Sequence, residues 1–328
     1  METLTTISGM NNSPRRFVLL ALGIAGSLVF IIGLFNYLVD PYGLFGFNRS
    51  AIYISAEREF KSSEVQRFPH DALLVGNSRM GMIPVADLNG FKFFNAALGS
   101  GTAEEMYYFL KHFAHKQKLV ILGVDLGQGD PDSLKGDIFA PSTLTATLNN
   151  LLNLKTVEYS VKTIYSHFKG IPVTLRDDGS FYVQPWFDRW DKPDPAYMAY
   201  AVEELRRSYL KNLDTSDIPM TFYSQIAKCL RERGITVVAV VPPIYEAVAS
   251  HLRDASVMTR YQAWRSRLQA IFPLVVDLSV SPYCAEENFF KADPVHFKPE
   301  VGVRILNTQV IPIAERAVNQ REAKAEKP

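Results

Sequence analysis

Cysteine is scarce in this chain of 328 residues, which contains only two. Cys229 and Cys284 lie far apart and match neither a CxxC metal pair nor a multi-bridge disulfide framework. We expect two unrelated buried thiols, with a single disulfide between them as the alternative. The sequence therefore excludes a CxxC-type metal centre and a fold held together by several disulfides.

Net charge is also small, since 35 basic residues stand against 34 acidic ones. A formal charge of +1 gives no overall field that would gather nucleic acid or an anionic membrane surface. The histidines show no metal-ligand spacing, and no GxGxxG or P-loop pattern follows the first expected strand. We therefore expect no metal, no cofactor and no nucleic-acid partner, and phosphate or nucleotide binding is disfavoured.

A long apolar run is present near the N-terminus. Residues 17–39 contain no charged side chain over 23 positions, and as a helix rising about 1.5 Å per residue they span about 34 Å. This length crosses a hydrocarbon core of about 30 Å, and a buried core helix would show a polar face. Arg15 and Arg16 resemble the basic start of a signal peptide, but no clear A-x-A-like cleavage site follows. We predict an uncleaved transmembrane helix, with a signal peptide as the alternative.

The basic residues around this helix predict its orientation. Arg15 and Arg16 precede the helix, whereas Arg49 is the first basic residue after it. Because short basic segments remain on the cytoplasmic side, residues 1–16 are expected in the cytoplasm and the rest of the chain outside it. In a bacterium, this is a single-pass protein of the inner (cytoplasmic) membrane whose main domain is periplasmic or extracellular.

Beyond residue 69, short apolar segments alternate with helical patterns. Such alternation is typical of a parallel sheet covered by helices on both faces. We predict a doubly wound, flavodoxin-like three-layer α/β domain over residues 70–318. Ligands bind at the carboxyl ends of the strands in such sheets. The expected strands end at Val75, Ala97, Val124, Val241 and Asp277.

Three further segments lack this alternation. Residues 40–69 are expected to form a stalk with a short helix, and the charged residues 319–328 a disordered tail. Residues 130–209 combine polar stretches with aromatic clusters and have no linker-like boundary, so we interpret them as an insertion over the active edge. Three of the aromatic side chains would either stack on sugar rings or pack onto the sheet, namely Trp186, Phe187 and Trp190.

Two distant loops carry residues suited to nucleophilic catalysis. Ser78 follows the first strand directly and precedes an expected helix, so nearby backbone N–H groups could stabilise an oxyanion. Asp293 lies three residues before His296 on a loop that leads into the last helix. A carboxylate at this spacing can orient an imidazole, and a neutral imidazole can take a proton from a serine. A lone serine is more often a helix cap, but the Asp–His pair favours a catalytic role.

These motifs resemble the SGNH (GDSL-like) hydrolases, and more closely their membrane-anchored branch found beside O-acyltransferases of cell-envelope polysaccharide pathways. GNSR at residues 76–79 is similar to the first block with its nucleophilic serine, NAALGSG to the second block, and DPVHF to the last. The resemblance covers roughly residues 71–309 and implies the same serine, aspartate and histidine as a catalytic triad. It also implies an oxyanion hole made by the N–H groups of Ser78 and Gly99.

The third block departs from the family pattern. The family usually has GxND, whose asparagine is a further oxyanion donor, whereas this chain has GVDLGQGD. Losing one such donor typically lowers the rate by about 100- to 1000-fold, unless Asn77 or Gln128 substitutes for it. Asp125 is expected to be a strand-end carboxylate without a catalytic role. Arg79 would bind an acidic group of the substrate or form an ion pair with a neighbouring aspartate.

The resemblance implies an esterase or O-acyltransferase acting on O-acyl groups, with O-acetyl expected, of an envelope or exported polysaccharide or of a small ester. Water as the acceptor gives hydrolysis, and a sugar hydroxyl gives transfer. The alternative is a protein with the same fold but no catalytic activity. It would be an accessory protein that binds a polysaccharide or a membrane O-acyltransferase partner. The triad favours the enzyme, whereas the missing third-block asparagine favours the accessory protein.

Overall fold

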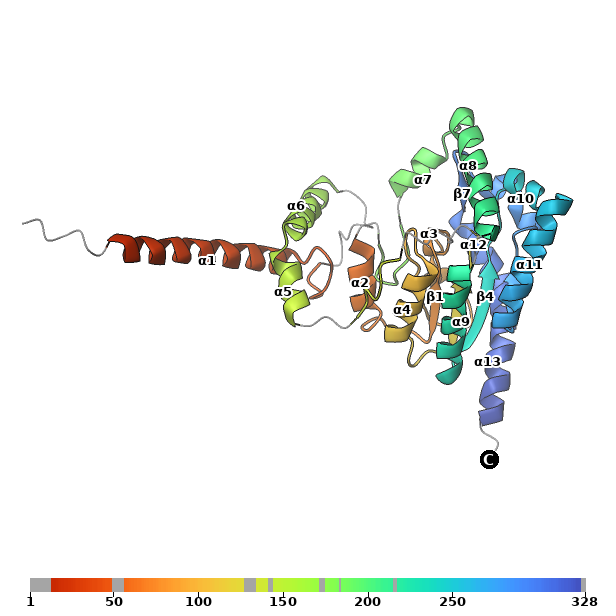
Figure 1. Cartoon of the computed structure of the whole chain (residues 1–328), viewed down its shortest axis with the longest axis horizontal. Coiled ribbons are helices and arrows are strands. Elements are labelled where there is room, and N and C mark those ends of the chain that lie inside the picture. The colour runs from red at the N-terminus through yellow and green to blue at the C-terminus, as the bar shows by residue number, and fades with distance from the viewer. Residues whose placement is uncertain are drawn as a thin grey trace, which may run out of the picture.

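A parallel five-stranded sheet forms the centre of the protein (Figure 1). The computed structural model describes residues 13–48, 56–126, 134–140, 144–170, 175–182, 184–214 and 217–325. The strands are β1 (Ala72–Val75), β2 (Phe93–Asn95), β3 (Leu119–Gly123), β4 (Thr236–Val241) and β5 (Val275–Asp277). They lie in the order β2-β1-β3-β4-β5, and all neighbouring pairs are parallel. The predicted α/β architecture with a parallel sheet is therefore confirmed.

Strands β1 to β4 are buried on both faces, which explains their continuous apolar sequences, whereas the edge strand β5 is partly exposed. Successive side chains of a strand point to opposite faces, and Leu73 and Leu74 of β1 belong to different cores. The first core is covered by α4 (Ala103–Phe113), α9 (Asp217–Glu232), α10 (Glu246–Leu252) and α11 (Ala255–Ile271). The second is covered by α3 (Ser78–Gly81), η2 (Val85–Asp87), α12 (Pro299–Ile305), the π-helical turn η6 (Leu306–Val310) and α13 (Ile311–Ala325). The result is a three-layer arrangement.

A short antiparallel hairpin follows the last strand of the sheet. The chain passes through the 3₁₀ turns η4 (Pro282–Cys284) and η5 (Glu286–Asn288) into β6 (Phe289–Phe290) and β7 (Asp293–Phe297). Phe289 and Phe297 are buried in the second core, which fixes the hairpin to the domain. As a result β7 lies against α3, directly after the carboxyl end of β1.

The N-terminal helix α1 (Ser13–Val39) projects away from the sheet (Figure 1). Its segment Pro14–Val39 is long and apolar enough to cross a membrane, and none of its most hydrophobic window is buried inside the protein. The predicted apolar helix is therefore present, and its described length includes the whole run from residue 17 to 39.

The long segment between β3 and α9 divides into two parts, which corrects the prediction of a single insertion over the active edge. Helices α5 (Leu144–Leu152) and α6 (Leu154–Lys169) pack against α1. Helices α7 (Gln184–Trp190) and α8 (Pro195–Asp214) instead lie near β7. The sequence showed aromatic clusters throughout but did not show which partner each cluster contacts.

The predicted stalk is also corrected, because helix α2 (Glu57–Glu64) is part of the domain. Phe60 and Lys61 are fully buried, and Arg58 forms a salt bridge with Glu105 of α4 at 2.8 Å. The charged sequence EREFKSSE suggested a solvated helix. The reason for the difference is that its charges find partners on distant elements, so they can be buried.

The predicted tail is wrong for residues 319–325, which continue helix α13. Val318 is buried in the second core. Beyond it, Arg321 donates hydrogen bonds to the backbone carbonyls of Lys118 and Gly234, and Glu322 forms an ion pair with Lys118 at 3.2 Å. These contacts at the start of β3 and β4 stabilise a segment whose composition alone indicates disorder.

Candidate active site

Ser78 lies in a tight turn between β1 and α3, at the carboxyl edge of the sheet. Gly76 is required in this turn because a Cβ atom there would lie 2.5 Å from Met80 Cγ. Asn77 caps α3, since its Oδ1 accepts a hydrogen bond from the backbone N–H two residues later at 3.1 Å. The turn therefore fixes Ser78 as the first residue of the helix, where its side chain is only half-buried.

His296 and Asp293, at the far end of the chain, meet Ser78 in one hydrogen-bonded relay. Ser78 Oγ lies 2.9 Å from His296 Nε2, and His296 Nδ1 lies 2.6 Å from Asp293 Oδ2. Because an ionised carboxylate only accepts, Nδ1–H donates to Asp293, and Nε2 of the neutral imidazole accepts from the Ser78 hydroxyl. This is the geometry by which an imidazole removes the proton of a serine nucleophile.

The orienting carboxylate is itself held in place. Asp293 is buried, and its Oδ1 accepts hydrogen bonds from the backbone N–H groups of Val295 at 2.8 Å and His296 at 3.3 Å. Hydrogen bonds from N–H groups to one oxygen leave the other free for the imidazole. The structure thus brings all three predicted catalytic residues together.

Trp190, at the end of α7, covers the imidazole and was not predicted to do so. Its ring stacks on the His296 ring, with centroids 5.1 Å apart and an interplanar angle of 11°. Trp190 also packs against Phe290, and its carbonyl accepts a hydrogen bond from Ala292 N at 2.7 Å. Phe187 stacks on Phe290 as well. These two residues therefore pack on the β6–β7 hairpin and not on the five-stranded sheet as the packing alternative had it, whereas Trp186 contacts Trp190 and is partly exposed.

We expect the substitution Trp190→Ala to lower kcat for ester hydrolysis by about two- to ten-fold, because an aromatic contact contributes about 0.5–1.5 kcal/mol beyond its buried area. Trp190→Phe should recover most of this loss. Tyr200→Ala, at an exposed aromatic residue of the neighbouring helix α8, serves as the matched control. If Trp190→Ala and Tyr200→Ala show equal kcat and equal unfolding temperatures, Trp190 does not position the imidazole.

Arg79, next to Ser78, is 2% exposed and connects the ends of strands β1, β3 and β4. Its Nη1 donates to Asp125 Oδ2 at 2.9 Å, and its Nη2 donates to the carbonyl of Pro243. Asn77 Nδ2 donates to the same Asp125 oxygen at 2.9 Å. Asp125 follows β3 and Pro243 follows β4. The ion-pair alternative for Arg79 is therefore confirmed. Asn77 and Arg79 were expected to bind substrate, but their hydrogen bonds hold the turn at Ser78 in place.

The predicted oxyanion hole is only half available. The N–H of Gly99 donates a 2.8 Å hydrogen bond to Oε1 of Glu57, so it cannot reach an oxyanion unless Glu57 moves; the expected role of Gly99 is corrected on this point. The N–H of Ser78 has no acceptor among the residues that the structure describes. Gln128, the other expected donor, lies outside the described residues.

Glu57 and Lys61 are two buried ionisable residues of α2 behind this loop, and Glu57 forms a salt bridge with Arg58 at 2.8 Å. Lys61 donates from Nζ to the carbonyl of Ala97 and lies 4.3 Å from the centroid of the Phe181 ring. Burial lowers the pKa of Lys61 to about 7, and burial raises the pKa of the Glu57 carboxyl. Sequence reasoning missed both residues, because an i, i+4 Glu–Lys pair is usually a solvated helix pair.

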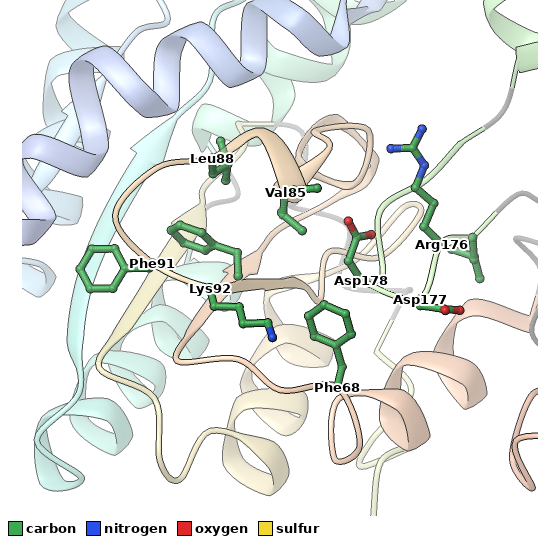
Figure 2. A pocket seen from close by; sticks show the side chains of 11 residues that line it. Phe68, Val85, Leu88, Phe91, Lys92, Arg176, Asp177 and Asp178 are labelled. Carbon is green, nitrogen blue, oxygen red and sulfur yellow. The ribbon is translucent and has the colours of Figure 1, made fainter.

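A separate pocket of about 680 Å³ lies beside the edge strand β2 (Figure 2). Figure 2 shows Lys92 directed toward Phe68, and the Nζ to ring-centroid distance is 5.7 Å. The pocket includes Phe93, the first residue of β2, whereas the triad lies at the carboxyl ends of the strands; none of the triad residues lines it. Over the described ranges, no group of three or more His, Cys, Asp or Glu side chains could hold a metal ion.

The distances within the relay are the main guide to function. No family model matches this chain, and a search of curated proteins finds no match. The three side chains come from segments more than 200 residues apart, yet they form consecutive hydrogen bonds of 2.9 Å and 2.6 Å. Such an arrangement is recognised by its geometry and by the role of each group.

Proposed function

We propose that this chain is a membrane-anchored serine esterase or O-acyltransferase of the SGNH type. The observation that carries the proposal is the hydrogen-bonded relay from Ser78 through His296 to Asp293 at the carboxyl edge of a parallel sheet. Ligands of α/β sheets bind at this edge. The motif resemblance supports an O-acyl group, with O-acetyl expected, on an envelope or exported polysaccharide as the substrate.

In the first half-reaction, Ser78 Oγ attacks the acyl carbonyl carbon while its proton moves to His296 Nε2. The C=O bond becomes a C–O⁻ single bond, and the N–H of Ser78 is placed to stabilise this oxyanion. Asp293 stabilises the imidazolium that forms. When the intermediate collapses, the ester C–O bond breaks, and His296 returns its proton to the leaving sugar oxygen.

In the second half-reaction, an acceptor hydroxyl attacks the acyl group on Ser78. His296 takes the proton of the acceptor, the bond between the acyl carbon and Oγ breaks, and Oγ regains a proton from the imidazolium. Water as the acceptor releases a carboxylic acid, whereas a sugar hydroxyl gives an acylated sugar. Ser78 is half-exposed, which supports access for either acceptor.

The proposal includes an anchor and a compartment. The apolar helix α1 would cross the inner membrane, since about 20 apolar residues suffice to span a bilayer. Arg15 and Arg16 lie in the first turn of α1, ahead of its uncharged run, which supports a cytoplasmic N-terminus and a periplasmic or extracellular α/β domain.

A second candidate is favoured by the contact between Glu57 and Gly99. A carboxylate on the second oxyanion donor, together with the missing third-block asparagine, leaves few groups to stabilise a tetrahedral intermediate. The chain would then be an accessory protein that binds a polysaccharide or a membrane O-acyltransferase partner through the same edge. The two candidates differ in whether Ser78 forms a covalent adduct.

A fluorophosphonate probe tests the proposal on the purified full chain in detergent. We expect Ser78 Oγ to displace the fluoride, so that mass spectrometry finds the phosphonyl adduct on the peptide containing Ser78. The variant Ser78→Ala should lose the adduct, and Ser100→Ala, at an exposed serine of the neighbouring loop, should keep it. If the wild-type chain forms no adduct, the enzyme proposal is wrong and the accessory role is favoured.

A further inference from the structure

Helix α6 is polar inside and apolar outside, the reverse of a helix in a water-soluble domain. Its buried face carries the small hydroxyl residues Thr156, Ser160, Thr163 and Ser166 together with Tyr159. Its exposed face carries Leu154 (78% exposed), Val161 (55%), Tyr165 (56%) and Phe168 (83%), with one charged residue among them, Glu158, which pairs with Lys162. Spacings of seven, four and three positions place these four side chains on one helical face. An apolar face of this kind requires an apolar neighbour.

The small polar face is used for packing against α1. Ser160 Oγ donates to Asn36 Oδ1 at 2.8 Å, and Asn36 Nδ2 donates to the carbonyl of Leu151 at 2.7 Å. Gly33 lets α5 approach closely, because a Cβ atom there would lie 3.3 Å from a leucine side chain of α5. Small residues and hydroxyl or amide hydrogen bonds between helices, with apolar side chains outside, are typical of helices packed in lipid.

The position of this contact along α1 indicates the depth of the hairpin. Gly33 and Asn36 belong to the last two turns of α1, within the segment Pro14–Val39 that could cross a membrane. Figure 1 shows α5 and α6 beside that end of α1, between the projecting helix and the sheet domain. The exposed leucines Leu148 and Leu152 of α5 add to the same apolar region.

We propose that the α5–α6 hairpin is embedded in the outer lipid interface of the membrane that α1 crosses, with the exposed face of α6 toward the acyl chains. This inference rests on the proposed role of α1 as an anchor. Tyr165 fits the headgroup boundary, where aromatic residues with one polar end are enriched. The protein thus contacts the bilayer through a spanning helix and an interfacial hairpin.

The charges on α6 match a lipid surface. Lys155, Lys162 and Lys169 lie beside the apolar face and are exposed. Lys162 forms an ion pair with Glu158, so Lys155 and Lys169 supply the net positive charge. Lysine stems can lie along apolar surface while the ammonium group reaches the headgroups, and anionic lipids add attraction. Continuity with the exposed apolar surface of α1 favours lipid over a second copy of the chain, because both surfaces then share one environment.

Site-specific fluorescence on the full chain in vesicles tests this inference. Cys229→Ser leaves only the buried Cys284, and the environment-sensitive dye NBD is then attached at Val161→Cys or Phe168→Cys. Leu28→Cys in α1 reports on the anchor, and Lys228→Cys on the exposed side of α9 is the water control. The vesicles contain phosphatidylcholine with or without phosphatidylglycerol, and lipids with a doxyl group either high or deep on the acyl chain quench the dye.

We expect NBD at positions 161 and 168 to show blue-shifted emission and loss of fluorescence with the shallow doxyl lipid, more so with phosphatidylglycerol. The dye at position 228 should show neither effect. If positions 161 and 168 behave like position 228 while position 28 is quenched by deep doxyl lipids, the hairpin inference is wrong and the anchor stands. A blue shift without quenching indicates a second copy and also overturns the inference. Absence of quenching at position 28 contradicts the proposed anchor itself.

Discussion

Replacing Asp293 by asparagine is expected to lower kcat for p-nitrophenyl acetate hydrolysis by about 10⁴-fold, the loss typical of this change in a Ser–His–Asp relay. The physical reason is the tautomer of His296. An asparagine NH₂ facing Nδ1 forces the proton to Nε2, and Nε2–H cannot accept the proton of Ser78. The backbone hydrogen bonds to Oδ1 at 2.8 and 3.3 Å can remain, so the fold should be retained.

The matched control is Asp87→Asn, at an exposed aspartate in a 3₁₀ turn, which should leave kcat unchanged. The double variant Ser78→Ala with Asp293→Asn should be no slower than Ser78→Ala alone, because members of one relay do not act additively. Equal activities of the wild-type chain and Asp293→Asn would show that the hydrogen bond at 2.6 Å between Asp293 and His296 does not serve catalysis.

Removing the charge of Arg79 is expected to reduce the free energy of unfolding by about 3–5 kcal/mol, because Arg79→Met leaves the buried Asp125 carboxylate without a cation beside it, while the hydrogen bond from Asn77 remains. The pair is held at 2.9 Å, with side chains only 2% and 7% exposed. The measurement is urea unfolding of the full chain in detergent, followed by tryptophan fluorescence. Arg79→Met also removes the hydrogen bond to the carbonyl of Pro243, which further lowers the free energy of unfolding.

The double variant Arg79→Met with Asp125→Leu separates the pair from general packing. We expect it to recover most of the lost stability, since a buried ion pair can often be replaced by apolar side chains of similar volume. Arg207→Met, which breaks an exposed salt bridge with Glu203, should change the free energy by less than about 1 kcal/mol. A cost for Arg79→Met as small as that for Arg207→Met would show that Arg79 does not stabilise the strand ends.

The sheet was predictable because four of its five strands, β1 to β4, are buried on both faces. Residues such as Leu73 and Leu74 are fully buried on opposite sides, so the local sequence shows a continuous apolar run that needs no knowledge of partners. The capping box at Thr102 and Glu105 at the start of α4 is equally local, since it joins residues three positions apart by two hydrogen bonds of 3.2 Å. Features that depend on a few adjacent residues are therefore the ones that a sequence can predict.

Features that depend on distant partners were not predictable in the same way. Lys61 is buried because the Ala97 carbonyl and the Phe181 ring surround its ammonium group, and neither contact has a signal in the sequence around it. Trp190 was recognised as an aromatic of the active edge, but its stacking on His296 depends on how α7 docks. The triad itself was predictable only because its motifs are short and adjacent to expected strand ends.

The loop that follows α1 packs into the sheet domain through one cluster of seven buried residues: Tyr42, Ala56, Phe60, Met82, Tyr159, Leu175 and Phe181. Met82 directly follows α3, so a tilt of α1 would shift the surroundings of the Ser78 turn, since a close-packed cluster transmits displacement. If α1 is fixed in a bilayer, the sheet edge that carries Ser78 lies at a fixed distance from the membrane and in a fixed orientation. If the proposed function holds, the distance of a polysaccharide from the membrane would limit which acyl groups reach Ser78. Polysaccharides near the membrane would react, and released ones would not.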